Sequence, residues 1–287
     1  MIDETVREIE EMQTHSSSIV AVKAAEALAE LADREFPTVE AYLRALEQNS
    51  HALQRANPSH ASLHTTQEAI IDRVRSADPA DVDEATKLTQ DAIDDVVADV
   101  TAAKERAASR AVDVIAEDDT LLLHDYSSTV ISTLEKAIDA GETFDLYLTE
   151  SRPRYLGRKT ARELSEHPGL DVTLIVDSAS GYYLSECDRV LLGMTCIVED
   201  RLYNRVGTYP LASTAADCDV PVTIVGSGAK IVDGGFSFEN DFRPASEVMR
   251  EPADGFTIEN PAYDATPVRL LDTVVTDDGV VDPLAED

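Results

Sequence analysis

The chain has 287 residues, with 56 Asp and Glu against 24 Lys and Arg, which gives a formal net charge of −32 at pH 7. A negative charge of this size repels nucleic acid, which excludes direct nucleic-acid binding as a main role. No apolar run approaches the roughly 20 residues that a membrane-spanning helix needs, and nothing near the amino terminus resembles a signal peptide. We therefore expect a cytoplasmic protein without membrane contact.

Lysine is scarce even among the few cations, because the chain contains only six lysines and arginine supplies the rest. The acids are spread over nearly every predicted helix instead of being gathered in one tail. A dispersed acidic surface that is poor in lysine indicates a halophilic protein, since concentrated salt screens the repulsion between carboxylates. An acidic protein adapted to ordinary salt is the alternative that composition leaves open.

We expect the thermal stability of this chain to increase as potassium chloride is raised from dilute to molar concentrations. The physical reason is that screening relieves the self-repulsion of a folded chain that carries −32 formal charges. Melting temperatures measured along a potassium chloride series test this. A melting temperature that does not depend on salt would remove the argument for halophilic adaptation.

Residues 1–116 carry no strand pattern and are predicted to form a helical bundle domain. Alanine, glutamate and leucine dominate this region, and its apolar residues recur at helical spacing. Ser16, Thr38 and Asp78 are plausible helix caps. The predicted helices are Ile2 to Gln13, Ser17 to Arg34, Val39 to Gln54, Leu63 to Arg75 and Pro79 to Glu117.

Residues 117–287 are predicted to form a Rossmann-like α/β domain. Short apolar runs alternate there with helical patterns, which is typical of a doubly wound parallel sheet whose strands are buried on both faces. A short helix is expected near the end, at Pro267 to Val275. Sheets of this type bind ligands beyond the carboxyl ends of their strands. The predicted strands are Thr120 to Leu123, Phe144 to Leu148, Val172 to Val176, Arg189 to Leu192 and Val222 to Val225.

No metal or cofactor site is predicted. Cys187, Cys196 and Cys218 are odd in number and lack metal-ligand spacing, so we expect buried free thiols. His124 follows a predicted strand and could face a ligand, although a lone histidine at a strand end is more often a hydrogen-bonded structural residue. The other histidines singled out, which are His51, His60 and His64, form no convincing metal constellation.

Eight short motifs occur from Thr120 onward, in the order HDYSSTV, TESRP, GRKTA, VDSASGYY, DRVLLG, NRVGT, GSGAK and NPAYDATP. In this order they resemble the family of the alpha, beta and delta subunits of initiation factor 2B and their relatives, the ribose-1,5-bisphosphate and methylthioribose-1-phosphate isomerases. The resemblance implies an amino-terminal helical domain, a Rossmann-like domain and a homodimer formed through the latter. Together with the composition, it points to an archaeal protein.

The resemblance places the two catalytic groups of the isomerases, a cysteine and an aspartate, at Asp125 and Thr195 of this chain. A threonine hydroxyl is no general base near neutral pH, and an aspartate does not reproduce a thiol. Tyr126 and Ser127 instead match the turn of the alpha-type regulatory subunits. One catalytic alternative stays open, in which Asp125 acts as the base and another group supplies the acid.

The resemblance implies that the residues for binding a phosphorylated ligand are better preserved than the catalytic pair. A guanidinium fork suits phosphate oxygens. The alternative is that these arginines pair internally with Glu150, Asp177 or Glu199. The candidate ligand-binding residues are Arg152, Arg154, Asn204, Arg205, Lys230, Tyr126 and Ser127.

The phosphate-binding turn that the helical domain contributes in the isomerases is replaced here by His15, Ser16 and Ser17. A serine-rich helix start can still donate backbone amides to an anion, and simple capping of the helix is an equal alternative.

The hypothesis that these observations favour is a non-catalytic regulatory protein that binds a sugar phosphate or nucleotide and acts through a partner. The resemblance implies a translation initiation factor 2 subunit as that partner. The main alternative is a sugar-phosphate aldose–ketose isomerase with remodelled catalysis at Asp125. A scaffold with neither ligand nor chemistry is the third.

Overall fold

The computed structural model describes residues 2–11, 16–168, 170–232, 236–252 and 254–281. By its contacts the chain divides into two compact units, Met1–Ala103 and Lys104–Asp287. The division falls inside one long helix, α5, which runs from Val82 to Ala111. The boundary predicted from the sequence lies between residues 116 and 117. It is the point where the helical pattern ends, shortly before the first strand begins.

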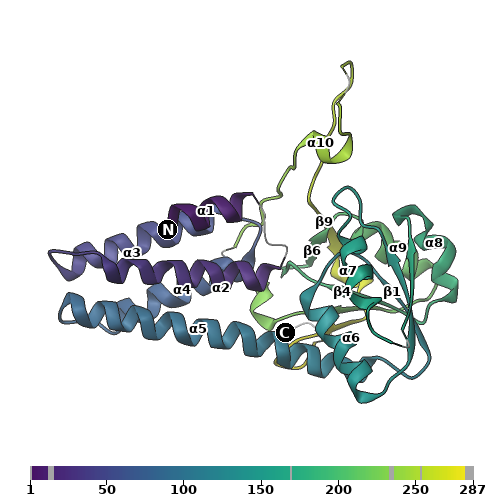
Figure 1. Ribbon diagram of the computed structural model, residues 1–287, viewed down its shortest axis with the longest axis horizontal. Coiled ribbons are helices and arrows are strands. Elements are labelled where there is room, and N and C mark those ends of the chain that lie inside the picture. Colours follow the sequence, from purple (N-terminus) through teal and green to yellow (C-terminus); the bar gives the residue numbers. More distant parts are fainter. Residues whose placement is uncertain (1, 12–15, 169, 233–235, 253, 282–287) are drawn as a thin grey trace. The chain divides into compact units, whose positions relative to one another are not determined.

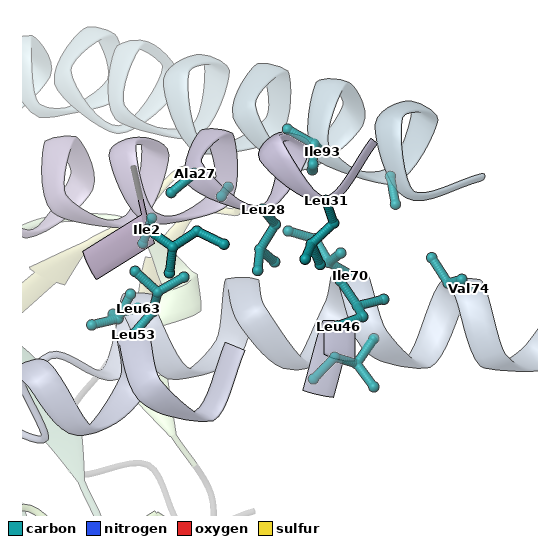
Figure 2. Close-up of a cluster of buried hydrophobic side chains, with 14 of the residues drawn as sticks. Ile2, Ala27, Leu28, Leu31, Leu46, Leu53, Leu63, Ile70, Val74 and Ile93 are labelled. Carbon is teal, nitrogen blue, oxygen red and sulfur yellow. The ribbon is translucent and has the colours of Figure 1, made fainter. Parts of the chain in front are cut away.

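The first unit is a bundle of helices around one apolar core. Leu28, Leu31, Leu53 and Leu63 are fully buried in this core, and Figure 2 shows their side chains converging from separate helices. The elements that contribute are α1 (Ile2–Glu10), α2 (Ser17–Ala27), the 3₁₀ turn Leu28–Asp33, α3 (Val39–Ala56), α4 (Ala61–Ser76) and the first part of α5.

Local signals set the ends of the bundle helices. The Thr38 hydroxyl accepts a hydrogen bond from the Ala41 amide at 3.2 Å and so caps α3, as its position in the sequence indicated. A 3₁₀ turn, Leu28–Asp33, follows α2, and a second, Val112–Val114, follows α5. The α-helices predicted to run to Arg34 and to Glu117 are therefore shorter than expected, and each is followed by a 3₁₀ turn.

The second unit contains a mainly parallel sheet whose strand order is β11-β10-β7-β4-β1-β2-β3. Only the short β11 runs antiparallel to its neighbour. The order 3-2-1-4 on one side of the sheet is that of a doubly wound nucleotide-binding fold. The strands are β1 (Asp119–Leu123), β2 (Phe144–Thr149), β3 (Asp171–Ile175), β4 (Arg189–Gly193), β7 (Val222–Val225), β10 (Thr273–Val275) and β11 (Val280–Val281).

Alternation along the strands sends apolar side chains into two separate cores. On β1, Leu121 and Leu123 join the core under α6 (Ser128–Ala140) and α7 (Leu156–Leu164), whereas Leu122 joins the core under α9 (Thr208–Asp217). Figure 1 shows α6 and α7 on one side of the sheet, with α8 (Ser180–Tyr183) and α9 on the other. The predicted fold, a helical region followed by a doubly wound sheet, is confirmed.

A second sheet, in the order β8-β5-β6-β9, was not foreseen from the sequence. Its strands are β5 (Cys196–Val198), β6 (Arg201–Arg205), β8 (Ile231–Val232) and β9 (Tyr263–Pro267). The helix predicted at Pro267 to Val275 is wrong, because this stretch contains the end of β9, a 3₁₀ turn at Val268–Leu270 and β10. Pairing of β9 with β6 and of β10 with β7 overrides the local helical spacing.

Two burial expectations also need correction. The strand predicted at Val172 to Val176 is an edge strand, so Leu174 is 45% exposed and Val176 is 54% exposed. Of the three free cysteines, Cys187 and Cys196 are buried as expected, whereas Cys218 is only half-buried. Burial raises the pKa of the Cys196 thiol to about 12, which keeps it protonated and unreactive.

Within the described ranges, no helix is long and apolar enough to cross a bilayer.

Candidate functional site

The candidate site is a small pocket at the carboxyl ends of β1 and β2, where the end of β6 also approaches. It encloses about 250 Å³ of non-atom space, part of which is open to solvent. The residues that line it come from the turns after these strands and from the segment between β8 and β9. They are Asp125, Ser151, Arg152, Pro153, Arg154, Arg205, Val206, Arg243, Glu247, Asn260, Pro261 and Ala262.

A buried ion pair forms the floor of the site. The Arg205 Nε lies 3.2 Å from the Asp125 Oδ2, and the two side chains are only 10% and 11% exposed. Burial lowers the pKa of the Arg205 guanidinium, but the charge of Asp125 and contact with Tyr263 outweigh this and raise the pKa above its usual value. Arg205 therefore stays charged inside the protein.

Each member of this pair has one polar atom left over. Asp125 Oδ1 and Arg205 Nη1 are buried and have no hydrogen-bond partner among the described residues. Buried polar atoms without partners are rare and costly in folded proteins. Both residues line the pocket, and these two atoms are themselves buried.

Strained backbone conformations hold Asp125 in place. Asp125 has φ 72° and Ser151 has φ 60°, a left-handed region that side chains other than glycine rarely adopt. The Ser151 Oγ accepts a hydrogen bond from the Asp125 amide at 2.7 Å. The Asp177 carboxylate in turn accepts from the amides of Ser151 and Arg152, at 2.7 and 2.8 Å. These bonds lock the turns after β1 and β2 together.

His124, directly before Asp125, is structural. It is buried, with its Nδ1 2.6 Å from the Thr149 Oγ1 and its Nε2 3.0 Å from the Val206 carbonyl oxygen. A Cβ added at Gly207 would lie 2.7 Å from this ring, so the turn after β6 packs directly on it. The ring thereby joins the ends of β1, β2 and β6.

Four arginines and only two carboxylates line the pocket, in a chain with a net charge of −32. The Arg152 guanidinium donates to the Tyr155 hydroxyl at 2.7 Å and to the Val248 carbonyl at 3.0 Å. Burial, and then the charge of Arg205, lower the pKa of Arg154. Repulsion between the mostly buried guanidiniums of Arg154 and Arg205 favours the uptake of an anion.

Arg243 is a pocket residue that sequence reasoning missed. Its signal, the Phe242-Arg243-Pro244 tripeptide, stands in a tail that otherwise shows no periodic pattern. The Arg243 amide donates to the Asn260 carbonyl at 2.8 Å, and Phe242 forms a β-bridge with Pro261. These contacts hold the segment against the residues that directly precede β9.

The sequence left open whether the candidate arginines pair with Glu150, Asp177 or Glu199, and in the structure their acidic partners are other residues. Glu150 pairs with Arg158, and Asp177 binds backbone amides instead of a guanidinium. Arg154 lies 3.8 Å from Glu247 and Arg205 pairs with Asp125. The partners of these two arginines are therefore themselves pocket residues.

The pocket brings together Asp125, Arg152, Arg154 and Arg205 from the predicted set, and the other candidates lie outside its lining. Ser127 caps α6 through the Val130 amide, and the Tyr126 ring lies 3.7 Å from the Lys159 Nζ. Asn204 bonds to Thr208 at 3.1 Å, and Lys230 donates to the Met194 carbonyl at 3.1 Å. Thr195, the residue after Met194, is half-buried.

The predicted serine-rich anion turn of the helical domain falls partly outside the described residues. His15 is not among them, whereas Ser16 and Ser17 are buried where α2 begins. Within the described ranges, no group of three or more His, Cys, Asp or Glu is placed to hold a metal ion.

The fold and the pocket define an α/β protein with a buried carboxylate and an arginine-lined pocket at the carboxyl ends of its strands. Residues 13–283 match the Initiation factor 2 subunit family, and the chain belongs to that family.

Curated relatives align over nearly the whole chain. The ribose 1,5-bisphosphate isomerase of Haloterrigena turkmenica is 31% identical over 97% of this chain and 89% of its own length. The enzyme of that name from Methanocaldococcus jannaschii is 29% identical over 99% of this chain and 92% of its own length.

Solved structures agree in fold. The translation initiation factor eIF-2B of Pyrococcus horikoshii is 25% identical, with a TM-score of 0.84 over 99% of this chain and 97% of that one. The 5-methylthioribose 1-phosphate isomerase of the same organism is also 25% identical, with a TM-score of 0.81 over 98% of this chain and 84% of that one.

These relatives correct the main functional hypothesis. The non-catalytic regulatory role inferred from Asp125 and Thr195 is wrong, because the curated relatives that cover this chain almost completely carry the names of isomerases. The alternative, an aldose–ketose isomerase with altered catalytic residues, is better supported.

Proposed function

We propose that this chain is an aldose–ketose isomerase that acts on a phosphorylated pentose of the ribose 1,5-bisphosphate type. The observation that carries the proposal is the Asp125 carboxylate, which belongs to a pocket that four described arginines also line and has one buried oxygen without a hydrogen-bond partner among the described residues. The names of the full-length relatives support the same reaction class.

A pentose that carries a phosphate on carbon 1 has no free aldehyde, so the bond between carbon 1 and the ring oxygen must break during isomerisation. The base takes the proton from carbon 2, the acid protonates the departing ring oxygen, and the enol that forms gains a proton on carbon 1 while its hydroxyl on carbon 2 loses one. In this proposal Asp125 Oδ1 removes the proton, while Arg205 holds Oδ2 and fixes the orientation of the carboxylate. The unpartnered Arg205 Nη1 donates to the oxygen on carbon 2, which gains negative charge as the enol becomes the ketone. A fixed donor of this kind stabilises the transition state more than the ground state.

Lys230 is the proposed acid, on the strength of its burial and its bond next to Thr195, although it does not line the pocket itself. Burial lowers the pKa of its ammonium group to about 8, and its Nζ is held 3.1 Å from the carbonyl of Met194. The next residue, Thr195, occupies the position where the resemblance places the second catalytic group of the isomerases. A group with a pKa near the working pH both donates and regains a proton efficiently.

The activity of the wild-type chain is expected to fall as pH rises above about 8, because Lys230 must be protonated to act as the acid. A profile of kcat/KM against pH measures this, and Lys230→Met should remove the alkaline limb together with most of the activity. A profile that stays level well above about pH 8 would show that Lys230 is not the acid.

One phosphate is assigned to Arg152, the first arginine after β2. Asp177 fixes the turn that carries it, and a guanidinium donor matches phosphate oxygens.

Turnover by the full chain tests the proposed function. Ketose formation should be measured with ribose 1,5-bisphosphate, methylthioribose 1-phosphate and ribose 5-phosphate at a fixed, high potassium chloride concentration. We expect conversion of at least one sugar that carries a phosphate on carbon 1. If all three stay unconverted by folded protein, the proposed function is overturned.

A further inference from the structure

The segment between β8 and β9 contributes its own charged groups to the pocket. This segment carries α10 (Ala245–Val248) and is seen extending from the sheets in Figure 1. Arg243 and Glu247 reach the pocket from it, and the backbone bonds of Arg243 and Phe242 to the approach of β9 set their position. The function proposed above uses neither side chain.

Glu247 lies between two guanidiniums and binds neither of them closely. Its Oε1 is 3.6 Å from the Arg243 Nη2 and 3.8 Å from the Arg154 Nε. These separations are longer than the roughly 2.7–2.9 Å of a strong charge-assisted hydrogen bond. The Oε2 accepts a bond from the Asn260 Nδ2 at 3.2 Å, which holds the carboxylate where it is.

Arg243 is incompletely satisfied. Its Nη1 lies 3.3 Å from Asp241, but its Nε is buried and has no hydrogen-bond partner within the described part of the chain. Its side chain is 13% exposed, so water does not fully replace the missing partner. A carboxylate offers two oxygens, whereas a phosphate offers three and carries more negative charge.

We propose that Arg154 and Arg243 form a second phosphate subsite, and that the Glu247 carboxylate occupies this subsite until a phosphoryl group of the substrate displaces it. The proposal rests on the proposed function in one respect, since it assigns the second phosphate of a pentose bisphosphate to these two arginines. The substrate class is then a sugar phosphorylated at both ends.

Binding of inorganic phosphate to the substrate-free chain tests this subsite without any turnover. Isothermal titration should compare wild type, Glu247→Gln, Arg243→Ala and the double variant at one fixed potassium chloride concentration. We expect Glu247→Gln to bind phosphate about tenfold more tightly, equivalent to about 1.4 kcal/mol, because the competing charge is removed. The Arg243→Ala change should weaken binding, and it should cancel the gain in the double variant.

Glu251→Gln and Arg250→Ala are the matched controls, because both residues are exposed on the same segment and neither lines the pocket. They should leave phosphate affinity unchanged. Glu247→Ala serves as a second variant if Glu247→Gln does not fold, with the same expected gain.

Phosphate binding to a folded Glu247 variant that is equal to or weaker than wild type would overturn the subsite, as would an Arg243→Ala chain with wild-type affinity. Because these outcomes involve no catalysis, they are separate from a failure of the proposed isomerase activity.

Discussion

Replacement of Asp125 by asparagine is expected to lower kcat for the sugar-phosphate isomerisation by about 10²–10⁴-fold, the usual contribution of a general base. The amide cannot accept the sugar proton, although it retains nearly the shape of the carboxylate. Turnover of ribose 1,5-bisphosphate by the two proteins measures the effect. Asp145→Asn is a matched control, because Asp145 is exposed on β2 and does not line the pocket.

The Asp125 variant also leaves Arg205 as a buried charge without its partner, which costs about 3–5 kcal/mol of stability in comparable cases. Activity should therefore be expressed per folded protein, with the fraction folded taken from circular dichroism. Retention of wild-type turnover by folded Asp125→Asn would rule out this carboxylate as the base.

A large loss of stability is expected for Gly157→Ala. A Cβ at this position would lie 1.8 Å from the backbone carbonyl oxygen of Thr149, where α7 crosses the end of β2. Backbone atoms cannot move aside as a flexible side chain does, so the helix must shift. We expect a loss of about 3 kcal/mol or more in the free energy of unfolding, at or above the usual range for overpacking.

Urea unfolding at a fixed salt concentration measures this loss, with Gly141→Ala as the control. Gly141 has φ 95° but nothing within 4 Å of an added Cβ, so its substitution should cost only about 1–2 kcal/mol. A smaller loss for Gly157→Ala than for Gly141→Ala would mean that α7 is not packed as described.

The parallel sheet could be predicted because its information is local. Leu121, Leu122 and Leu123 form a short apolar run in which successive side chains enter opposite cores, and the neighbouring strands repeat this pattern. The small sheet could not be predicted, because β6 pairs with β9 about 60 residues later and strands of two or three residues leave no periodic trace.

The site was predictable where a residue directly follows a strand. Arg152 and Arg154 come after β2 and reach the pocket for that reason, as does Asp125 after β1. Asn204 and Arg205 are adjacent on β6, and alternation sends only one of them to the pocket. Arg243 approaches through backbone pairing in an irregular segment, which no local pattern reveals.

The mistaken functional hypothesis has a specific physical origin. The sequence showed that Asp125 and Thr195 stand where the resemblance places the two catalytic groups of the isomerases. It did not show the burial or the hydrogen-bond partners of the side chains around them. The unpartnered oxygen of Asp125 and the burial of Lys230 become visible only in three dimensions. The proposed function assigns the base and the acid to these two groups.

The most direct test is the formation of ribulose 1,5-bisphosphate from ribose 1,5-bisphosphate by the full chain in deuterated water, followed by nuclear magnetic resonance. The proposed mechanism predicts turnover of at least about 1 per second, an ordinary enzymatic rate, with solvent deuterium at carbon 1 of the ketose because base and acid are different groups. Ketose formation no faster than in buffer alone would contradict it.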